Sequence, residues 1–275
     1  MKLLSQRILT PLAGWLLLAV LALALPLLAS ARNVPIPKPK LVLVHGAFAD
    51  SSSWNGVIER LRDKGYTVIA AANELRSVEG DAAAVSSLLK SIHGPVVLVG
   101  HSYGGPVISE AATGQDNVKA LVYVAAFAPE VGENAAELSG RFPGSSLGSA
   151  LAPPVALADG GKDLYIDQDK FHAQFAADVP AAQAALMAVG QRPVTDAALH
   201  EASTSAAWKS IPSWFIYGSA DRNIPPAAQA FMAKRAHSRK TVVIKGASHV
   251  VMVSHPTEVA ALIEQAALAS SRPST

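Results

Sequence analysis

PVVLVGHSYGGPVI, residues 95–108, places Ser102 midway between Gly100 and Gly104 at the point where an apolar run ends. The run at 95–100 is typical of a buried strand, and the residues after the serine favour a helix. A serine at such a strand–turn–helix junction takes a strained backbone conformation that costs about 1–3 kcal/mol. Side chains in place of Gly100 or Gly104 would collide with the neighbouring strand or helix. The stretch therefore predicts a turn that lifts the Ser102 hydroxyl above the edge of a sheet.

Short apolar runs alternate with helical patterns along most of the chain. Runs that are apolar at every position are typical of parallel strands covered by helices on both faces. The sequence therefore predicts an α/β fold with about six parallel strands, flanked by helices, in one domain over residues 41–270. The predicted strands are 41–46, 66–72, 95–100, 118–127, 213–218 and 240–246, and the predicted helices are 54–65, 79–92, 103–114, 226–236 and 256–269.

The alternation stops between residues 128 and 207. This segment is rich in glycine, proline and serine, and it shows helical patterns only around 168–177 and 180–189. A long irregular insertion between two sheet strands is typical of a functional loop region. We therefore expect a helical cap insertion over about 128–207 rather than a second domain with its own core.

Composition limits the classes of protein to which the chain can belong. Half of the 275 residues are apolar, 16% are charged and the formal net charge is +2, which argues against a nucleic-acid partner. The chain has no cysteine, so disulfides, thiol nucleophiles and cysteine zinc sites are excluded.

The first 31 residues have the pattern of a signal peptide. A short basic start precedes a Leu/Ala-rich stretch that ends at Ala29-Ser30-Ala31, a small-residue cleavage site. We expect cleavage near Ala31 and export to the periplasm or the medium. The alternative is an inner-membrane anchor at about 8–29, because the apolar run approaches the ~20 residues of a spanning helix. Residues 32–40 contain three prolines and predict an extended lead-in.

Three residue types suited to nucleophilic catalysis follow successive predicted strands. Ser102, Asp221 and His249 occur in this chain order, each just after a strand. In an open parallel sheet the carboxyl ends of the strands share one edge, so these side chains are expected to meet there. Serine needs a base to become nucleophilic, and the histidine needs a carboxylate to hold its tautomer. Glu130 and His255 remain the alternative acid and base.

Two backbone N–H groups are candidates for stabilising negative charge on a carbonyl oxygen. That of Tyr103 follows the serine at the start of a helix, where the helix dipole favours an anion. That of Ala47 lies in the loop after the first strand, where Gly46 allows a substrate to approach the backbone closely. The sequence indicates neither a metal nor a cofactor.

Five stretches resemble the α/β-hydrolase branch that contains small plant methylesterases, hydroxynitrile lyases and many bacterial esterases. They span nearly all of residues 40–268, and they are HGAFADSSSW (45–54), GHSYGG (100–105), YVAAFAPEVGE (123–133), DRNIPPAAQ (221–229) and SHVVMVSHP (248–256). The resemblance implies an α/β-hydrolase fold with a cap. It also implies that the nucleophile, base and acid are Ser102, His249 and Asp221, and that the oxyanion donors are Ala47 and Tyr103.

One departure from the branch favours ester hydrolysis over carbon–carbon cleavage. Its hydroxynitrile lyases have a threonine at the position of Gly46 and a lysine soon after the histidine, whereas Val250, Val251 and Met252 follow His249 here. The resemblance thus implies a carboxylesterase-type serine hydrolase acting through an acyl-enzyme. A lyase or a cofactor-free perhydrolase remains an alternative, and so does an exported binding protein with an idle site.

Aromatic side chains could line an apolar substrate pocket or pack the cap against the sheet. A small-molecule ester is the expected partner, with membrane contact only through an uncleaved N-terminal segment. No feature of the sequence specifies an oligomeric state. The residues predicted to contact the substrate are Phe48, Tyr165, Phe171, His172, Phe175 and Trp208.

Overall fold

The computed structural model describes residues 38–271, and the leader predicted over residues 1–31 lies outside them. Of the predicted lead-in at 32–40, only the part from Lys38 onward is described, and Lys40 already begins the first strand. Inside the described range, no helix is both long enough and apolar enough to cross a membrane.

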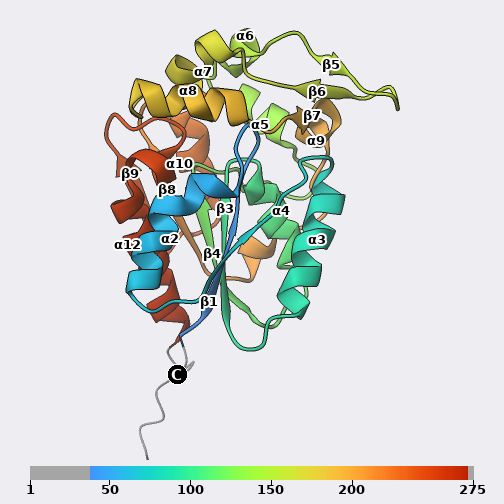
Figure 1. Cartoon of the computed structure of the whole chain (residues 1–275). Helices are drawn as coiled ribbons and strands as arrows, with labels where there is room; N and C mark the ends of the chain where they lie inside the picture. Colours follow the sequence, from blue (N-terminus) through green and yellow to red (C-terminus); the bar gives the residue numbers. More distant parts are fainter. Residues whose placement is uncertain (1–37, 272–275) are drawn as a thin grey trace, which may run out of the picture. The chain divides into compact units, whose positions relative to one another are not determined.

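Six parallel strands form the main sheet, which confirms the predicted fold class (Figure 1). The strands are β1 (Lys40–Val44), β2 (Val68–Ala71), β3 (Val96–His101), β4 (Val118–Val124), β8 (Ser213–Gly218) and β9 (Lys240–Ile244). Their spatial order is β2-β1-β3-β4-β8-β9. The central strands β3 and β4 are buried along almost their whole length, which explains why their sequences are apolar at nearly every position.

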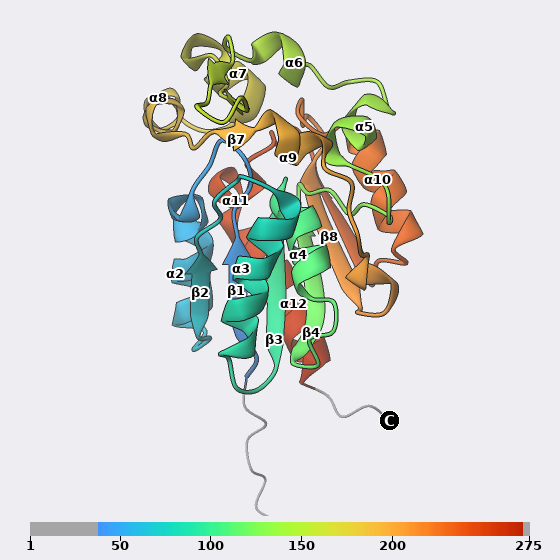
Figure 2. The same ribbon diagram turned by 90° about the vertical axis from the view of Figure 1, so that its right-hand side faces the viewer.

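Helices cover both faces of the sheet. They are η2 (Ser51–Trp54), α2 (Asn55–Asp63), α3 (Val78–Lys90), α4 (Gly104–Ala111), α10 (Pro226–Arg235), α11 (Val251–Ser254) and α12 (Pro256–Ser270). Helices α2 and α12 pack together on one face, and α3 and α4 pack together on the other (Figures 1 and 2). Helix α3 begins after Ser77, whose side chain accepts a hydrogen bond from the N–H of Gly80.

The insertion between β4 and β8 lies over the carboxyl ends of the strands (Figure 1). It contains α5 (Ala135–Gly140), α6 (Leu147–Ala150), β5 (Val155–Ala156), β6 (Lys162–Leu164), α7 (Gln168–Phe175), α8 (Ala181–Gly190), β7 (Val194–Thr195), α9 (Asp196–His200) and η3 (Ala207–Lys209). Helices α7 and α8 match the two that the sequence predicted. The antiparallel sheet β5-β6-β7 was not predicted, because strands of two or three residues are too short to show a pattern.

Glu133 fastens the start of the cap to helix α10. Its carboxylate accepts hydrogen bonds from Arg235 at 2.8 Å, from Arg141 at 2.9 Å and from the N–H of Glu130 at 2.9 Å. Burial opposes the charge on Glu133, but the hydrogen bonds from Arg235, Glu130 and Arg141 outweigh burial and lower the pKa of Glu133 to about 2.

Replacing Glu133 with glutamine should remove an acid-sensitive part of the stability. The folded-state pKa of about 2 lies below the ordinary value of 4.5, so the carboxylate stabilises the fold above pH 4.5 and loses this effect as the pH falls toward 2. At neutral pH Glu133→Gln should be the less stable protein, by on the order of 1–2 kcal/mol once screening by water is allowed for. Thermal unfolding followed by circular dichroism across this pH range should show a steeper decline for the wild type than for Glu133→Gln.

The control is Glu137→Gln, which changes an exposed carboxylate on α5, four residues after Glu133. This variant should unfold with the pH dependence of the wild type. Parallel curves for the wild type and Glu133→Gln would contradict the role given to Glu133.

Candidate active site

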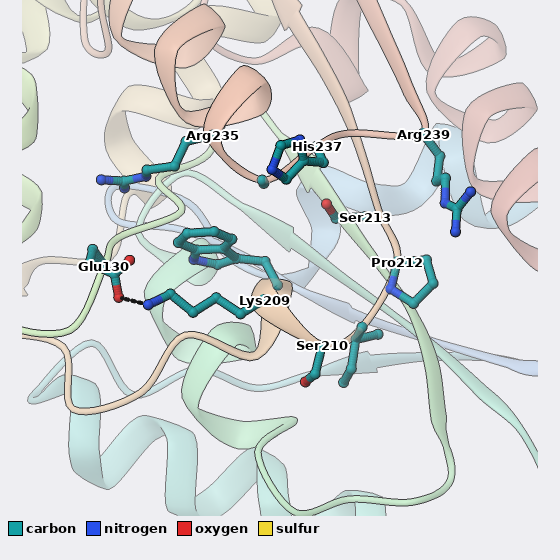
Figure 3. Close-up of a pocket in the computed structure, with 11 residues that line it drawn as sticks. Glu130, Lys209, Ser210, Pro212, Ser213, Arg235, His237 and Arg239 are labelled. Carbon is teal, nitrogen blue, oxygen red and sulfur yellow. Dashed lines mark ion pairs between the residues drawn. The ribbon is translucent and has the colours of Figure 1, made fainter.

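A hollow of about 610 Å³ lies at the N-terminal end of β8 (Figure 3). Glu130, the alternative acid, lines it and is held by Lys209 in an ion pair of 2.6 Å. Trp208 lines it as well, together with Ser213, the first residue of β8. Ser102 instead follows the carboxyl end of β3. Glu130 and Trp208 therefore line a different hollow from the one beside Ser102.

Ser102 occupies the tight turn between β3 and α4. Its φ of 53° lies in the left-handed region, which costs a residue other than glycine about 1–3 kcal/mol. A Cβ on Gly100 would lie 2.6 Å from the carbonyl oxygen of Gly104, and a Cβ on Gly104 would lie 2.7 Å from the carbonyl oxygen of Val44 in β1. The predicted need for glycine on both sides of the turn is thus confirmed.

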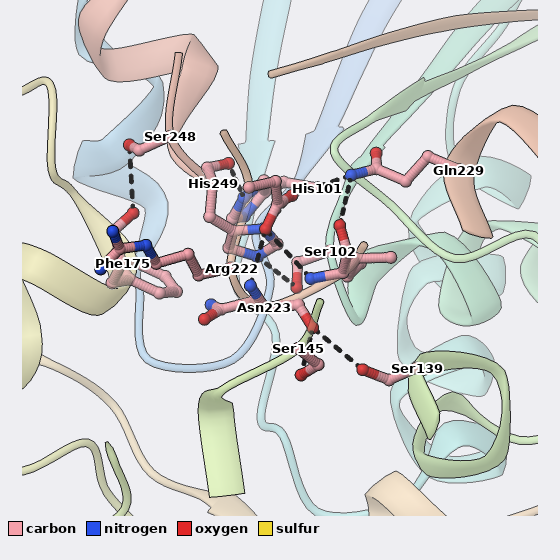
Figure 4. Close-up of polar contacts among 12 residues, drawn as sticks. His101, Ser102, Ser139, Ser145, Phe175, Arg222, Asn223, Gln229, Ser248 and His249 are labelled. Atoms are coloured by element: carbon pink, nitrogen blue, oxygen red, sulfur yellow. Dashed lines mark hydrogen bonds and ion pairs between the residues drawn. The ribbon is translucent and has the colours of Figure 1, made fainter. Parts of the chain in front are cut away.

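Ser102, His249 and Asp221 form a continuous chain of hydrogen bonds (Figure 4). His249 Nε2 lies 2.9 Å from Ser102 Oγ, and His249 Nδ1 lies 2.8 Å from Asp221 Oδ2. Because a carboxylate only accepts, Nδ1–H donates to Asp221 and leaves Nε2 free to accept the serine proton. The exposed fractions of His249, Asp221 and Ser102 are 0%, 3% and 7%, so water screens these contacts little. His255, the alternative base, lies beside Asp178 at 3.5 Å instead.

Four donors hold the carboxylate of Asp221. Besides His249, the N–H groups of Asn223 and Ile224 donate to Oδ1 at 2.8 Å and 3.0 Å, and the side-chain amide of Gln229 donates to Oδ2 at 2.8 Å (Figure 4). Gln229 is 1% exposed and also donates to the carbonyl of Ile224 at 3.0 Å. The sequence analysis missed Gln229. The signal that points to it is a polar residue on the buried face of α10, since buried polar groups need partners.

The two predicted oxyanion donors, Ala47 and Tyr103, both line the cavity at Ser102. Among the described residues, neither of their backbone N–H groups donates to another protein group. The buried hydroxyl of Tyr103 donates to Asp81 at 3.0 Å, which anchors the residue. Burial raises the pKa of Asp81, and burial together with the charge of Asp81 raises the pKa of Tyr103, so the phenol keeps its proton. The role of the two N–H groups as oxyanion donors stays a prediction.

Two further histidines lie near the site without joining the chain of hydrogen bonds. The ring of His101 is fully buried at 4.8 Å from the ring of His249, and burial, reinforced by His249, lowers the pKa of His101 well below its ordinary value. His45 Nε2 accepts the N–H of Asn73 at 3.1 Å, and burial lowers the pKa of His45. Both rings are therefore neutral at physiological pH.

A cavity of about 60 Å³ lies beside the Ser102 hydroxyl. Its walls come from the loops after β1 and β4, from the cap and from the loop that carries Asp221. Among the described residues that line it, Phe48 is the only one of the six predicted substrate contacts. The other large apolar lining residues are Phe127, Leu147, Leu199 and Ile224.

The other five predicted substrate contacts do not line this cavity; they are Tyr165, Phe171, His172, Phe175 and Trp208. The ring centroid of Phe175 lies 5.2 Å from that of His249, and the ring centroid of Phe171 lies 4.9 Å from that of Phe175. His172 Nε2–H donates to the carbonyl of Val179 at 2.9 Å within the cap. Phe171 and Phe175 thus serve the packing of the cap, which is the alternative that the sequence left open.

The surroundings of Gly46 leave no room for a side chain. A Cβ at this position would lie 2.6 Å from the Cβ of Ser102 and 2.7 Å from the carbonyl oxygen of His101. The threonine of the hydroxynitrile lyases therefore does not fit this backbone. Across residues 38–271, no three His, Asp or Glu side chains cluster in a way that could hold a metal ion.

Comparisons with known proteins agree with this fold. The alpha/beta hydrolase nvfD of Aspergillus novofumigatus is 28% identical over 251 residues, which cover 84% of this chain and 97% of that protein. The pimeloyl-(acyl-carrier protein) methyl ester esterase of Aeromonas hydrophila is 26% identical over 252 residues, which cover 82% and 94%. The crystal structure of polyneuridine aldehyde esterase has a TM-score of 0.73 at 19% identity, over 83% of this chain and 99% of that chain. The family signature of alpha/beta hydrolases matches residues 41–262. Because this match spans most of the sequence, the chain belongs to the alpha/beta hydrolase family.

Proposed function

We propose that the protein is a carboxylesterase-type serine hydrolase that cleaves esters of small or medium-sized molecules through an acyl-enzyme. The observation that carries the proposal is the buried chain of hydrogen bonds from Ser102 through His249 to Asp221. The esterases among the relatives support an ester substrate, and the name of one of them specifies a methyl ester.

In the first step, the Ser102 hydroxyl attacks the ester carbonyl carbon while His249 Nε2 takes its proton. Asp221 stabilises the imidazolium that forms. The N–H groups of Ala47 and Tyr103 stabilise the negative oxygen, an effect worth roughly 3–4 kcal/mol for a single donor in known enzymes. His249 then gives the proton to the departing alcohol, and the acyl group stays on the serine.

In the second step, a water molecule gives a proton to His249 and attacks the acyl carbon. The bond from the acyl group to Ser102 breaks, the acid leaves, and the serine regains its proton from His249. The two steps balance with one ester and one water molecule. A small-molecule ester is therefore the partner that the proposal requires.

Ser102→Ala should fold normally but lose turnover of p-nitrophenyl acetate by several orders of magnitude, because no other group at the site can carry the acyl chain. Asp221→Asn should lose about 10⁴-fold, because the amide favours the wrong tautomer of His249. A fluorophosphonate should label the wild type and leave Ser102→Ala unlabelled. Ser87→Ala, which changes an exposed serine on α3, is the control and should match the wild type. A wild type that shows neither turnover nor labelling would instead be a binding protein with an idle site.

Gln229→Leu should lower kcat while KM changes little, because Gln229 holds Asp221 and does not line the cavity. A hydrogen bond to a charged group is worth about 1.5–3 kcal/mol, which corresponds to a loss of roughly 10- to 100-fold. In Gln229→Glu the new carboxyl can donate only when protonated, so its activity relative to the wild type should rise as the pH falls. Steady-state kinetics across pH measures both effects.

The matched control is Gln115→Leu, which removes a half-buried amide that donates to Ser86 at 2.9 Å, beyond the end of α4. This variant should keep the kcat of the wild type at every pH. An equal loss of kcat in Gln115→Leu and Gln229→Leu would assign the effect to general destabilisation.

A further inference from the structure

Two hollows meet at Phe48. The inner cavity, beside Ser102, measures about 60 Å³, and the outer hollow, between the η2–α2 segment and helix α8, measures about 380 Å³. Among the described lining residues, Phe48 alone belongs to both. Its neighbour Ala47 lines the inner cavity and its neighbour Ala49 lines the outer hollow. Phe48 is therefore the residue at which the two spaces border each other.

The inner cavity suits a short, uncharged group. No charged residue is among the described residues that line it. The hydroxyl of Ser139 donates to the carbonyl of Asn223 at 2.9 Å, and that of Tyr103 donates to Asp81 at 3.0 Å, so both are already engaged. The volume of about 60 Å³ is small against the roughly 300–1,000 Å³ of small-molecule sites. A hydrocarbon group of a few atoms fills such a space.

The outer hollow is larger and has a mixed lining. Asp50, Ser52 and Ser53 line one side, and Leu186 and Met187 of helix α8 line the other. The described lining contains one acid and no base, which disfavours a negatively charged ligand. The volume lies within the roughly 300–1,000 Å³ of small-molecule sites.

Phe48 is held in place on several sides. Its φ of 59° lies in the left-handed region, which costs about 1–3 kcal/mol. Its N–H donates to the carbonyl of Arg192 in the cap at 3.0 Å. Its ring meets the ring of Phe175 edge-on, with the centroids 6.1 Å apart. The strained backbone and these contacts fix Phe48 beside the loop residue Ala47.

We propose that Phe48 is a specificity-determining gate between the two hollows. The substrate is an uncharged ester with a short group in the inner cavity and a bulkier group in the outer hollow. The inference rests on the proposed function, because it places the ester carbonyl at Ser102. The ring of Phe48 sets the maximum length of the short group, which is either the acyl or the alcohol part.

The test compares the wild type with Phe48→Ala on two series of neutral esters. One series lengthens the acyl chain from p-nitrophenyl acetate to the octanoate, and the other lengthens the alcohol from methyl to hexyl benzoate. In one series, wild-type kcat/KM should fall about tenfold or more for each carbon beyond the limit. Phe48→Ala should join the two hollows and abolish most of this decrease in kcat/KM with chain length. A limit in the acyl series would identify the acyl part as the short group, and a limit in the alcohol series would identify the alcohol part.

Phe231→Ala is the matched control, because this phenylalanine on α10 lines neither hollow. It should keep the length profile of the wild type. Phe48→Leu removes less of the side chain and should move the length limit by fewer carbons. It replaces Phe48→Ala in the test if the alanine variant does not fold. Labelling of Ser102 by a fluorophosphonate is measured on every variant.

Two results overturn the inference in different ways. The gate is overturned if the enzyme is labelled and active but shows no length limit in either series. It is also overturned if the folded Phe48 variants keep the limit of the wild type. Both results leave the proposed function standing. A wild type with neither labelling nor turnover of any ester overturns the proposed function and the gate with it.

Discussion

The site depends on holding Ser102 in a backbone conformation that a free chain avoids. The strain at this residue costs about 1–3 kcal/mol, and hydrogen bonds on both sides of it oppose that cost. The carbonyl of Ser102 accepts the N–H groups of Gly105 at 2.9 Å and Phe127 at 3.3 Å, and its own N–H donates to the carbonyl of Val124 at 3.3 Å. These bonds tie the turn to α4 and to the end of β4. The serine is thus positioned by the central sheet rather than by a free loop.

The cap is bonded to loops that carry the rest of the site. The N–H of Phe48 donates to Arg192, so the loop with the predicted oxyanion donor is tied to the cap. Ser139 donates to the carbonyl of Asn223 at 2.9 Å, and Gln174 donates to its side chain at 2.7 Å, so the loop with Asp221 is tied to it as well. The cavity of about 60 Å³ that these ties leave beside Ser102 is far smaller than the roughly 300–1,000 Å³ of small-molecule sites.

The sheet and the three polar side chains were predictable for related reasons. Strands buried on both faces, such as β3, are apolar throughout, and the carboxyl ends of parallel strands share one edge, so the meeting of Ser102 with His249 follows from topology. The role of Gln229 was not predictable. The pattern of its helix shows that the amide is buried and needs a partner, but it does not show that the partner is Asp221. The positions of the cap's aromatic side chains, such as Phe175, depend on how short irregular segments pack onto the sheet. Sequence periodicity does not show this packing. The leader over residues 1–31 and export stay predictions.

His101 lies against aromatic rings on two sides, with ring centroids 6.4 Å from both Trp54 and Phe175. Burial suppresses its protonation, so a positive charge formed on His249 during turnover meets no like charge in the adjacent ring. An ionised neighbour at 4.8 Å would oppose that charge strongly in a dry interior. The protein thus uses a titratable side chain as an electrically silent spacer, whose Nε2–H donates to the carbonyl of His249 at 3.3 Å.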